Sequence, residues 1–168
     1  MSERSAAPGA LALVESLVNT LDLETGADAL DTVEGRGRFG IAEDAMEEAR
    51  ELRESLRVVL LAHAGHPPHR AATPLGALLS RAPLYVSVDE RDGSAALAPA
   101  PDGRLLSRMA AAVAEAVAAG TWMRLKACEA VTCHWAYYDR SPAGRGRWCS
   151  MQVCGARAKM RRYRAKEG

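Results

Sequence analysis

The amino-acid sequence predicts a mainly helical α+β protein. We expect an N-terminal helical domain with one small antiparallel hairpin, followed by a C-terminal cysteine-bearing module that ends in a basic helix. Three observations lead to this prediction. Apolar residues recur at helical spacing in three segments, a single pair of β-rich runs encloses a turn, and all four cysteines lie within residues 128–154.

The helical segments are recognised by apolar residues at three- and four-residue steps. Residues 9–21 form the first such segment. Residues 42–64 form the second and longest segment, and we expect its charged residues to lie on exposed faces. Residues 105–119 form the third, which ends at Gly120. Residues 31–40 hold three glycines and few apolar residues, so we expect a loop there. The apolar stripe of the longest helix is Met46, Ala49, Leu52, Leu56, Val59, Leu60 and His63.

A β-hairpin lies between the second and third helices. Residues 84–88 are rich in β-branched and aromatic side chains, residues 94–98 form a second run, and Arg91-Asp92-Gly93 supplies the turn. A short helix is expected around residues 75–80. This N-terminal region has no nucleophile elbow, no glycine-rich phosphate loop and no histidine-glutamate metal helix, so we do not expect an enzyme.

Three closely spaced histidines, His63, His66 and His69, follow the end of the longest helix. They could bind a metal ion, because imidazole is a common metal ligand. The alternative, which we favour, is a solvated group that the negative end of the helix dipole stabilises.

Charge is distributed unevenly along the chain. Residues 1–123 hold 11 Lys and Arg against 18 Asp and Glu, a net charge of −7, whereas residues 124–168 hold 11 against 3, a net charge of +8. Such asymmetry is typical of a polyanion-binding module joined to an acidic domain. A solvated basic helix without a partner is the alternative.

The cysteines form two pairs, with four residues inside each pair and fifteen between the pairs. Two short-spaced pairs can place four thiolates tetrahedrally around one Zn²⁺ ion. An iron–sulfur cluster, two disulfides and free structural thiols are the alternatives. We do not expect His134 to be a ligand, because four sulfur atoms complete the site. The predicted zinc ligands are Cys128, Cys133, Cys149 and Cys154.

The final segment predicts a basic helix. Ala156, Met160 and Tyr163 recur at steps of four and three, and we expect them to pack against Trp148 or the zinc core. The cations on the rest of the helix repel one another, and a phosphate backbone would relieve this repulsion. The predicted nucleic-acid contacts are Arg145, Arg147, Arg157, Lys159, Arg161, Arg162, Arg164 and Lys166.

Several segments resemble the CGNR zinc-finger family of bacterial transcription regulators. They are Arg124-Leu125-Lys126-Ala127-Cys128, Tyr138-Asp139-Arg140-Ser141, Arg147-Trp148-Cys149-Ser150-Met151 and Cys154-Gly155-Ala156-Arg157. In that family the finger follows an ABATE-type domain, proposed to be stress-responsive or ligand-sensing, and residues 17–21 resemble the opening of that domain. The resemblance implies an ABATE-like regulatory domain over residues 1–120 and a treble-clef-like four-cysteine finger over residues 121–168.

The sequence departs from the family signature at Ala156, where the family has Asn, and at Ala143, where it often has Asn. Both changes leave the cysteines untouched but remove side chains that could brace the finger or contact a partner.

The favoured function is a zinc-binding, DNA-binding transcriptional regulator whose N-terminal domain senses a ligand or dimerises. RNA remains open as an alternative nucleic acid. The alternative functions are a zinc-stabilised protein–protein interaction module and a thiol or zinc-level sensor. A homodimer and an unknown small ligand of the N-terminal domain are also possible. Because the first residues lack the pattern of a secretory signal and no long apolar run occurs, we expect a soluble cytoplasmic protein without membrane contact.

Overall fold

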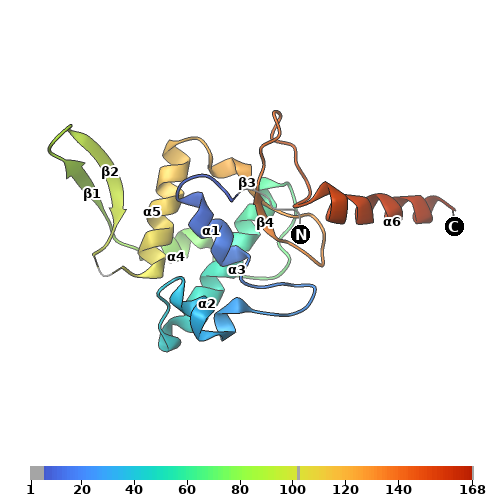
Figure 1. The fold of residues 1–168 in the computed structure, drawn as a ribbon, viewed down its shortest axis with the longest axis horizontal. Coiled ribbons are helices and arrows are strands. Elements are labelled where there is room, and N and C mark those ends of the chain that lie inside the picture. Colours follow the sequence, from blue (N-terminus) through green and yellow to red (C-terminus); the bar gives the residue numbers. More distant parts are fainter. Residues whose placement is uncertain (1–5, 102, 168) are drawn as a thin grey trace.

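The computed structural model describes residues 6–101 and 103–167. Its centre is formed by helices α1 (Leu11–Val18), α3 (Met46–His63) and α5 (Leu105–Ala118), as Figure 1 shows. The hairpin of β1 (Leu84–Asp89) and β2 (Ser94–Pro99) projects at one end of the molecule, and α6 (Ala156–Glu167) projects at the other. The predicted mainly helical α+β fold, with its hairpin, cysteine module and final helix, is confirmed.

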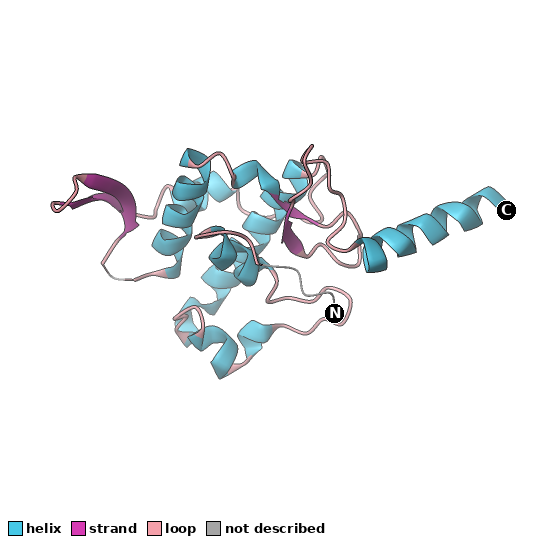
Figure 2. Cartoon of the chain, turned by 45° about the horizontal axis from the view of Figure 1, so that its top comes forward, coloured by secondary structure: helices cyan, strands magenta, loops and turns pink. Residues whose placement is uncertain are grey.

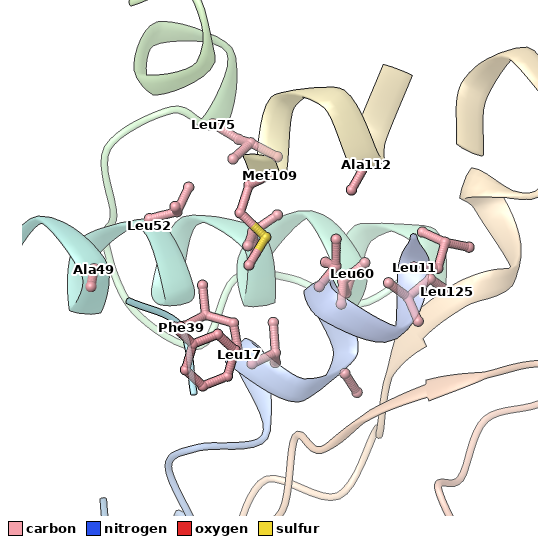
Figure 3. Close-up of a cluster of buried hydrophobic side chains, with 14 of the residues drawn as sticks. Leu11, Leu17, Phe39, Ala49, Leu52, Leu60, Leu75, Met109, Ala112 and Leu125 are labelled. Atoms are coloured by element: carbon pink, nitrogen blue, oxygen red, sulfur yellow. The ribbon is translucent and has the colours of Figure 1, made fainter. Parts of the chain in front are cut away.

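The hydrophobic core lies where the predicted apolar stripes meet. Leu17 of α1, Leu60 of α3 and Met109 of α5 are fully buried and point toward one another (Figure 3). The short helix α4 (Leu75–Leu79) adds Leu75 and Leu78 to the same cluster. Burial of these side chains, at about 1.5–3 kcal/mol each, supplies most of the stabilisation of the helical part.

The expected loop at residues 31–40 is wrong in part, because this segment folds into short helices. A 3₁₀ turn, η1 (Ala29–Asp31), leads into α2 (Val33–Gly37), and Thr32 caps α2 by accepting a hydrogen bond from the Gly35 amide at 3.0 Å. Gly35 is required for close packing, since a Cβ atom there would lie 1.9 Å from the Ala29 carbonyl oxygen. A further 3₁₀ turn, η2 (Glu43–Ala45), precedes α3.

The expectation that the charged residues of α3 lie on exposed faces is wrong for its middle. Arg53 is 4% exposed, Glu54 is 3% exposed and Arg57 is completely buried. They avoid the penalty of burial by pairing, with Glu54 accepting hydrogen bonds from both arginines. These charged residues therefore form a second packing face of α3, which the pattern of apolar residues does not indicate.

The β1–β2 hairpin has the predicted antiparallel pairing, with Val86 opposite Leu97. These two side chains lie on one face of the hairpin and remain 64% and 50% exposed. Among the helices of the described residues, none is long and apolar enough to cross a bilayer.

A second small sheet joins the C-terminal module to the helices. After a 3₁₀ turn, η3 (Trp122–Arg124), strand β3 (Leu125–Ala127) pairs antiparallel with β4 (Ala136–Tyr138). Leu125, Ala127 and Ala136 are buried in the same cluster as the helical core. The hydrophobic core therefore continues past residue 120 into the sheet of the cysteine module.

Asn19, at the end of α1, binds the edge of this sheet. Its side-chain amide donates to the carbonyl of Ala136 at 3.0 Å and accepts from the amide of the same residue at 2.7 Å. The side chain thus completes both backbone hydrogen bonds that a neighbouring strand would make.

Replacing Asn19 by alanine should lower the free energy of unfolding by about 2 kcal/mol, since two partly buried backbone groups of Ala136 lose their partners. Urea unfolding of the zinc-loaded protein measures this change. The control is Ser16→Ala, an exposed position of the same helix, which should change stability by less than about 0.5 kcal/mol. Equal stability of the two variants would contradict the bracing role of Asn19.

Candidate metal centre and basic helix

The four cysteines come from two loops of the C-terminal module. Cys128 follows β3 and Cys133 lies shortly before β4, so the small sheet places the first pair. Cys149 precedes, and Cys154 lies within, a π-helical turn, η4 (Met151–Gly155), that continues into α6. The β3–β4 sheet positions the first cysteine pair and the η4 turn positions the second, and together they bring the two pairs into contact.

The four sulfur atoms have the spacing that tetrahedral zinc requires. All four Sγ atoms lie within 4.8 Å of one another. The Sγ atom of Cys149 lies 3.6 Å from that of Cys133 and 3.7 Å from that of Cys154. A Zn–S bond of about 2.3 Å places the sulfurs of a tetrahedron about 3.8 Å apart. The cluster is therefore consistent with one zinc ion.

The pKa values of the thiols reflect the packing of four ionisable groups together. Hydrogen bonds from the Cys133 and Cys149 side chains lower the pKa of Cys128 to about 2, with help from the backbone amides of Cys149 and Ala130. The contact with Cys128 raises the pKa of Cys133 to about 12 and also raises that of Cys149. Four thiolates can coexist here only with a cation among them, which is the charge that zinc supplies.

A small shell of side chains surrounds the cluster. Ala130 and Trp148 pack against the cysteines. Gly155 allows the close approach of Trp148, because a Cβ atom at this position would lie 3.3 Å from the Trp148 Cδ1 atom and 3.0 Å from the sulfur of Met151. This contact is a physical reason for glycine after the last cysteine.

His134, beside Cys133, is buried but does not join the sulfur cluster. Its Nδ1 atom lies 2.8 Å from the carbonyl oxygen of Cys128, so this nitrogen carries the hydrogen and donates it. Its φ of 46° lies in the left-handed region, which turns the chain sharply after Cys133. The imidazole thus braces the first cysteine loop.

Asp139 organises the loop between the two cysteine pairs. Burial raises its pKa, but hydrogen bonds from the Ser141 amide, the Lys126 ammonium and the Gly146 amide outweigh burial and lower it. Lys126 is also buried and lies 2.9 Å from the carboxylate. The Tyr137 hydroxyl donates to the carbonyl of Gly146 at 2.7 Å. This network returns the chain toward Cys149.

Arg57 connects the cysteine module to the helical core, a role that sequence reasoning missed. Its guanidinium donates to the carbonyls of Val18 and His134, both at 2.8 Å, and to Glu54 at 3.1 Å. The side chain therefore ties α1, α3 and the loop after Cys133 together. The sequence holds only a weak signal for this role, since Arg57 lies one residue after Leu56 of the apolar stripe.

Each of the three histidines near the end of α3 lies against a different group. The Nδ1 atom of His63 lies 2.8 Å from the Leu125 carbonyl oxygen, and burial lowers its pKa. The Nε2 atom of His66 lies 3.6 Å from Glu129, and that of His69 lies 3.0 Å from Glu54. Within residues 6–101 and 103–167, only the cysteines group as a metal site.

The predicted apolar face of α6 is wrong. Met160 is 52% exposed and Tyr163 is 59% exposed, whereas Ala158 is buried. The reason is geometric, because α6 leaves the finger and projects away from it after its first turn (Figure 2). Among residues 151–166, the buried ones are Cys154, Gly155 and Ala158.

Two of the eight predicted nucleic-acid contacts form ion pairs in the structure. Arg147 pairs with Glu129, and Arg157 pairs with Glu24 of the N-terminal region at 3.0 Å. Arg145 is exposed in the loop before Arg147. The other five side chains are exposed and have no ion pair within the described part of the chain: Lys159, Arg161, Arg162, Arg164 and Lys166.

Comparison with known families agrees with this architecture. Residues 124–167 match the CGNR zinc finger. Residues 10–120 match the ABATE family, whose description is "putative stress-induced transcription regulator". No individual curated protein matches the chain. The helical core and the four-cysteine finger with its basic helix thus lie in the two matched segments, and the chain belongs to the ABATE family, with a CGNR zinc finger following the ABATE domain.

Proposed function

We propose that this protein is a DNA-binding transcription regulator in which zinc holds the finger and α6 binds DNA. The observation that carries the proposal is the projection of α6 from the four-cysteine cluster, with five cations that have no ion pair among the described residues. A regulator rather than an enzyme also agrees with the description of the family. The proposed zinc ligands are Cys128, Cys133, Cys149 and Cys154.

Zinc has a structural role in this proposal. A closed site of four cysteines leaves no open coordination position for a substrate. The ion fixes the two cysteine loops and hence the direction in which α6 leaves the finger. The cations of α6 repel one another in the free protein, and phosphate contacts relieve this repulsion while they release counterions.

The proposed division of the chain assigns sensing or dimerisation to residues 1–120 and DNA binding to residues 121–168. The exposed apolar face of the hairpin around Val86 and Leu97 favours dimerisation by the first part. A second copy would place a second finger on DNA and raise the affinity.

The second candidate function is docking of the basic helix on an acidic protein. The ion pair between Arg157 and Glu24 favours it, because α6 already contacts a carboxylate of the N-terminal region. Both side chains of this pair are about half exposed, however, and solvent-screened surface pairs contribute little. It leaves most of the cations of α6 available for DNA.

The test is binding of the zinc-loaded full-length protein to a random-sequence DNA duplex over a salt series. The double variant Arg161→Ala/Arg162→Ala should bind about 10-fold more weakly at moderate salt, because two phosphate or base contacts are lost. The slope of log affinity against log salt should fall by roughly 2.

The control removes the same charge elsewhere, in the double variant Arg81→Ala/Arg91→Ala. Both residues are exposed, Arg81 before β1 and Arg91 in the turn of the hairpin. The hairpin lies at the opposite end of the molecule from α6 (Figure 1). This control should bind DNA as the wild type does. If the folded, zinc-loaded wild type bound no duplex at low salt, the second candidate would replace the first.

A further inference from the structure

One side of η4 and α6 combines apolar and arginine side chains in a way that phosphate binding does not require. The side chains on this side of η4 and α6 line a shallow groove of about 470 Å³. Val153 is 46% exposed and Met160 is 52% exposed, although neither can contact a phosphate favourably. The members of this groove face are Gln152, Val153, Ala156, Arg157, Met160, Arg161 and Arg164.

The remaining cations lie outside the groove face. Lys159, Arg162 and Lys166 are exposed but do not line the groove. Consecutive helical residues point about 100° apart, so Arg161 and Arg162 belong to different sides of α6. The helix therefore carries two cationic surfaces, of which only one is interleaved with apolar side chains.

The shape of α6 allows it to enter a DNA groove. Its 12 residues extend about 18 Å, and beyond its first turn the helix stands clear of the body in both views (Figures 1 and 2). The major groove of B-form DNA is about 12 Å wide and accepts an α-helix. Within the groove face, the body of the protein contacts Arg157 through Glu24 and leaves Val153 and Met160 about half exposed.

We propose that the groove face of α6 reads base edges in the major groove, whereas Lys159, Arg162 and Lys166 contact phosphates. This inference rests on the proposed function. Arginine can donate two hydrogen bonds to guanine, and exposed apolar side chains can pack against the methyl group of thymine. Arg157 is engaged by Glu24 in the free protein, which leaves Arg161 and Arg164 as the available guanine readers. The protein would accordingly prefer particular sequences.

The experiment begins with selection from a randomised duplex library by the zinc-loaded full-length protein. The affinity for the enriched duplex is then compared with that for a scrambled duplex of the same composition. Arg161→Ala should lower this ratio about 10-fold or more, since a base contact is lost. Arg162→Ala, the matched control on the neighbouring residue, should weaken both duplexes equally and leave the ratio unchanged.

A second measurement tests the apolar contact. Replacing a single thymidine of the enriched duplex by deoxyuridine removes only the methyl group of that base. At one of the thymidine positions, this replacement should weaken binding by the wild-type protein about 3-fold. The Met160→Ala variant should bind the duplexes with and without this methyl group equally. Because Met160 is 52% exposed, we expect this variant to fold like the wild type. Circular dichroism and zinc content verify the fold of each variant.

The outcomes separate the two proposals. Binding to every duplex with equal affinity would overturn base reading by the groove face and leave the proposed function intact. An equal fall of the ratio in Arg161→Ala and Arg162→Ala would also overturn the assignment of faces. Absence of binding to any duplex at low salt would overturn the proposed function itself.

Discussion

Replacing Cys128 by serine should abolish zinc binding and unfold the finger. Cys128 is completely buried, its thiol is the one of the four whose pKa is lowered by its neighbours, and its carbonyl accepts the hydrogen bond from His134. Structural zinc sites contribute on the order of 10 kcal/mol of binding free energy to the folded state. Serine cannot replace a thiolate as a zinc ligand, so this contribution should be lost almost completely.

The loss should spread beyond the finger, because Leu125, Ala127 and Ala136 of its sheet belong to the helical core. We expect a lower melting temperature for the whole chain, together with loss of bound zinc. Metal content per chain and circular dichroism measure these changes. The control Thr132→Ala, exposed in the same loop, should keep one zinc ion. A Cys128→Ser variant that retained its zinc and its helical signal would show that Cys128 is not a ligand.

Replacing Arg57 by methionine should lower the free energy of unfolding by about 3–5 kcal/mol. Methionine fills a similar volume but leaves the carbonyls of Val18 and His134 without their donor. It also leaves the Glu54 carboxylate, 3% exposed, with one cation fewer. The cost comes from these unpaired buried groups rather than from lost packing.

Urea unfolding of the zinc-loaded variant measures this cost. Arg50→Met is the matched control on the same helix, since Arg50 pairs with the exposed carboxylates of Asp31 and Glu47. Its third partner, Asp28, keeps its ion pair with Arg53. Surface pairs contribute little, and we expect a change below about 1 kcal/mol. Similar stability of the two variants would mean that Arg57 does not connect the finger to the core.

Much of the fold could be predicted from local patterns. The apolar stripe of α3, the hairpin turn and the helix ending at Gly120 depend on neighbouring residues, and each occurs as expected. The cluster of four cysteines could also be predicted, because the spacing of the cysteines along the chain is typical of zinc ligands. Residues 31–40 form short helical turns rather than the expected loop. Gly35 permits a close contact with Ala29 there, which composition alone does not indicate.

Charged residues were the least predictable part of the sequence. The same helical spacing describes Arg50 at the surface and Arg57 in the core, and only the position of the finger distinguishes them. Met160 and Tyr163 present the converse case, because their spacing suits burial but both side chains are more than half exposed.

The sequence by itself determined the helical segments, the hairpin, the four sulfur ligands of one predicted zinc site and the charge asymmetry. Each of these depends on residue type and on spacing over a few turns of chain. Only the tertiary structure decided that the finger shares the helical core, that Arg57 and Asn19 join the two parts, and that α6 projects beyond the finger after its first turn. These features depend on contacts between residues far apart in the chain, which local periodicity does not encode.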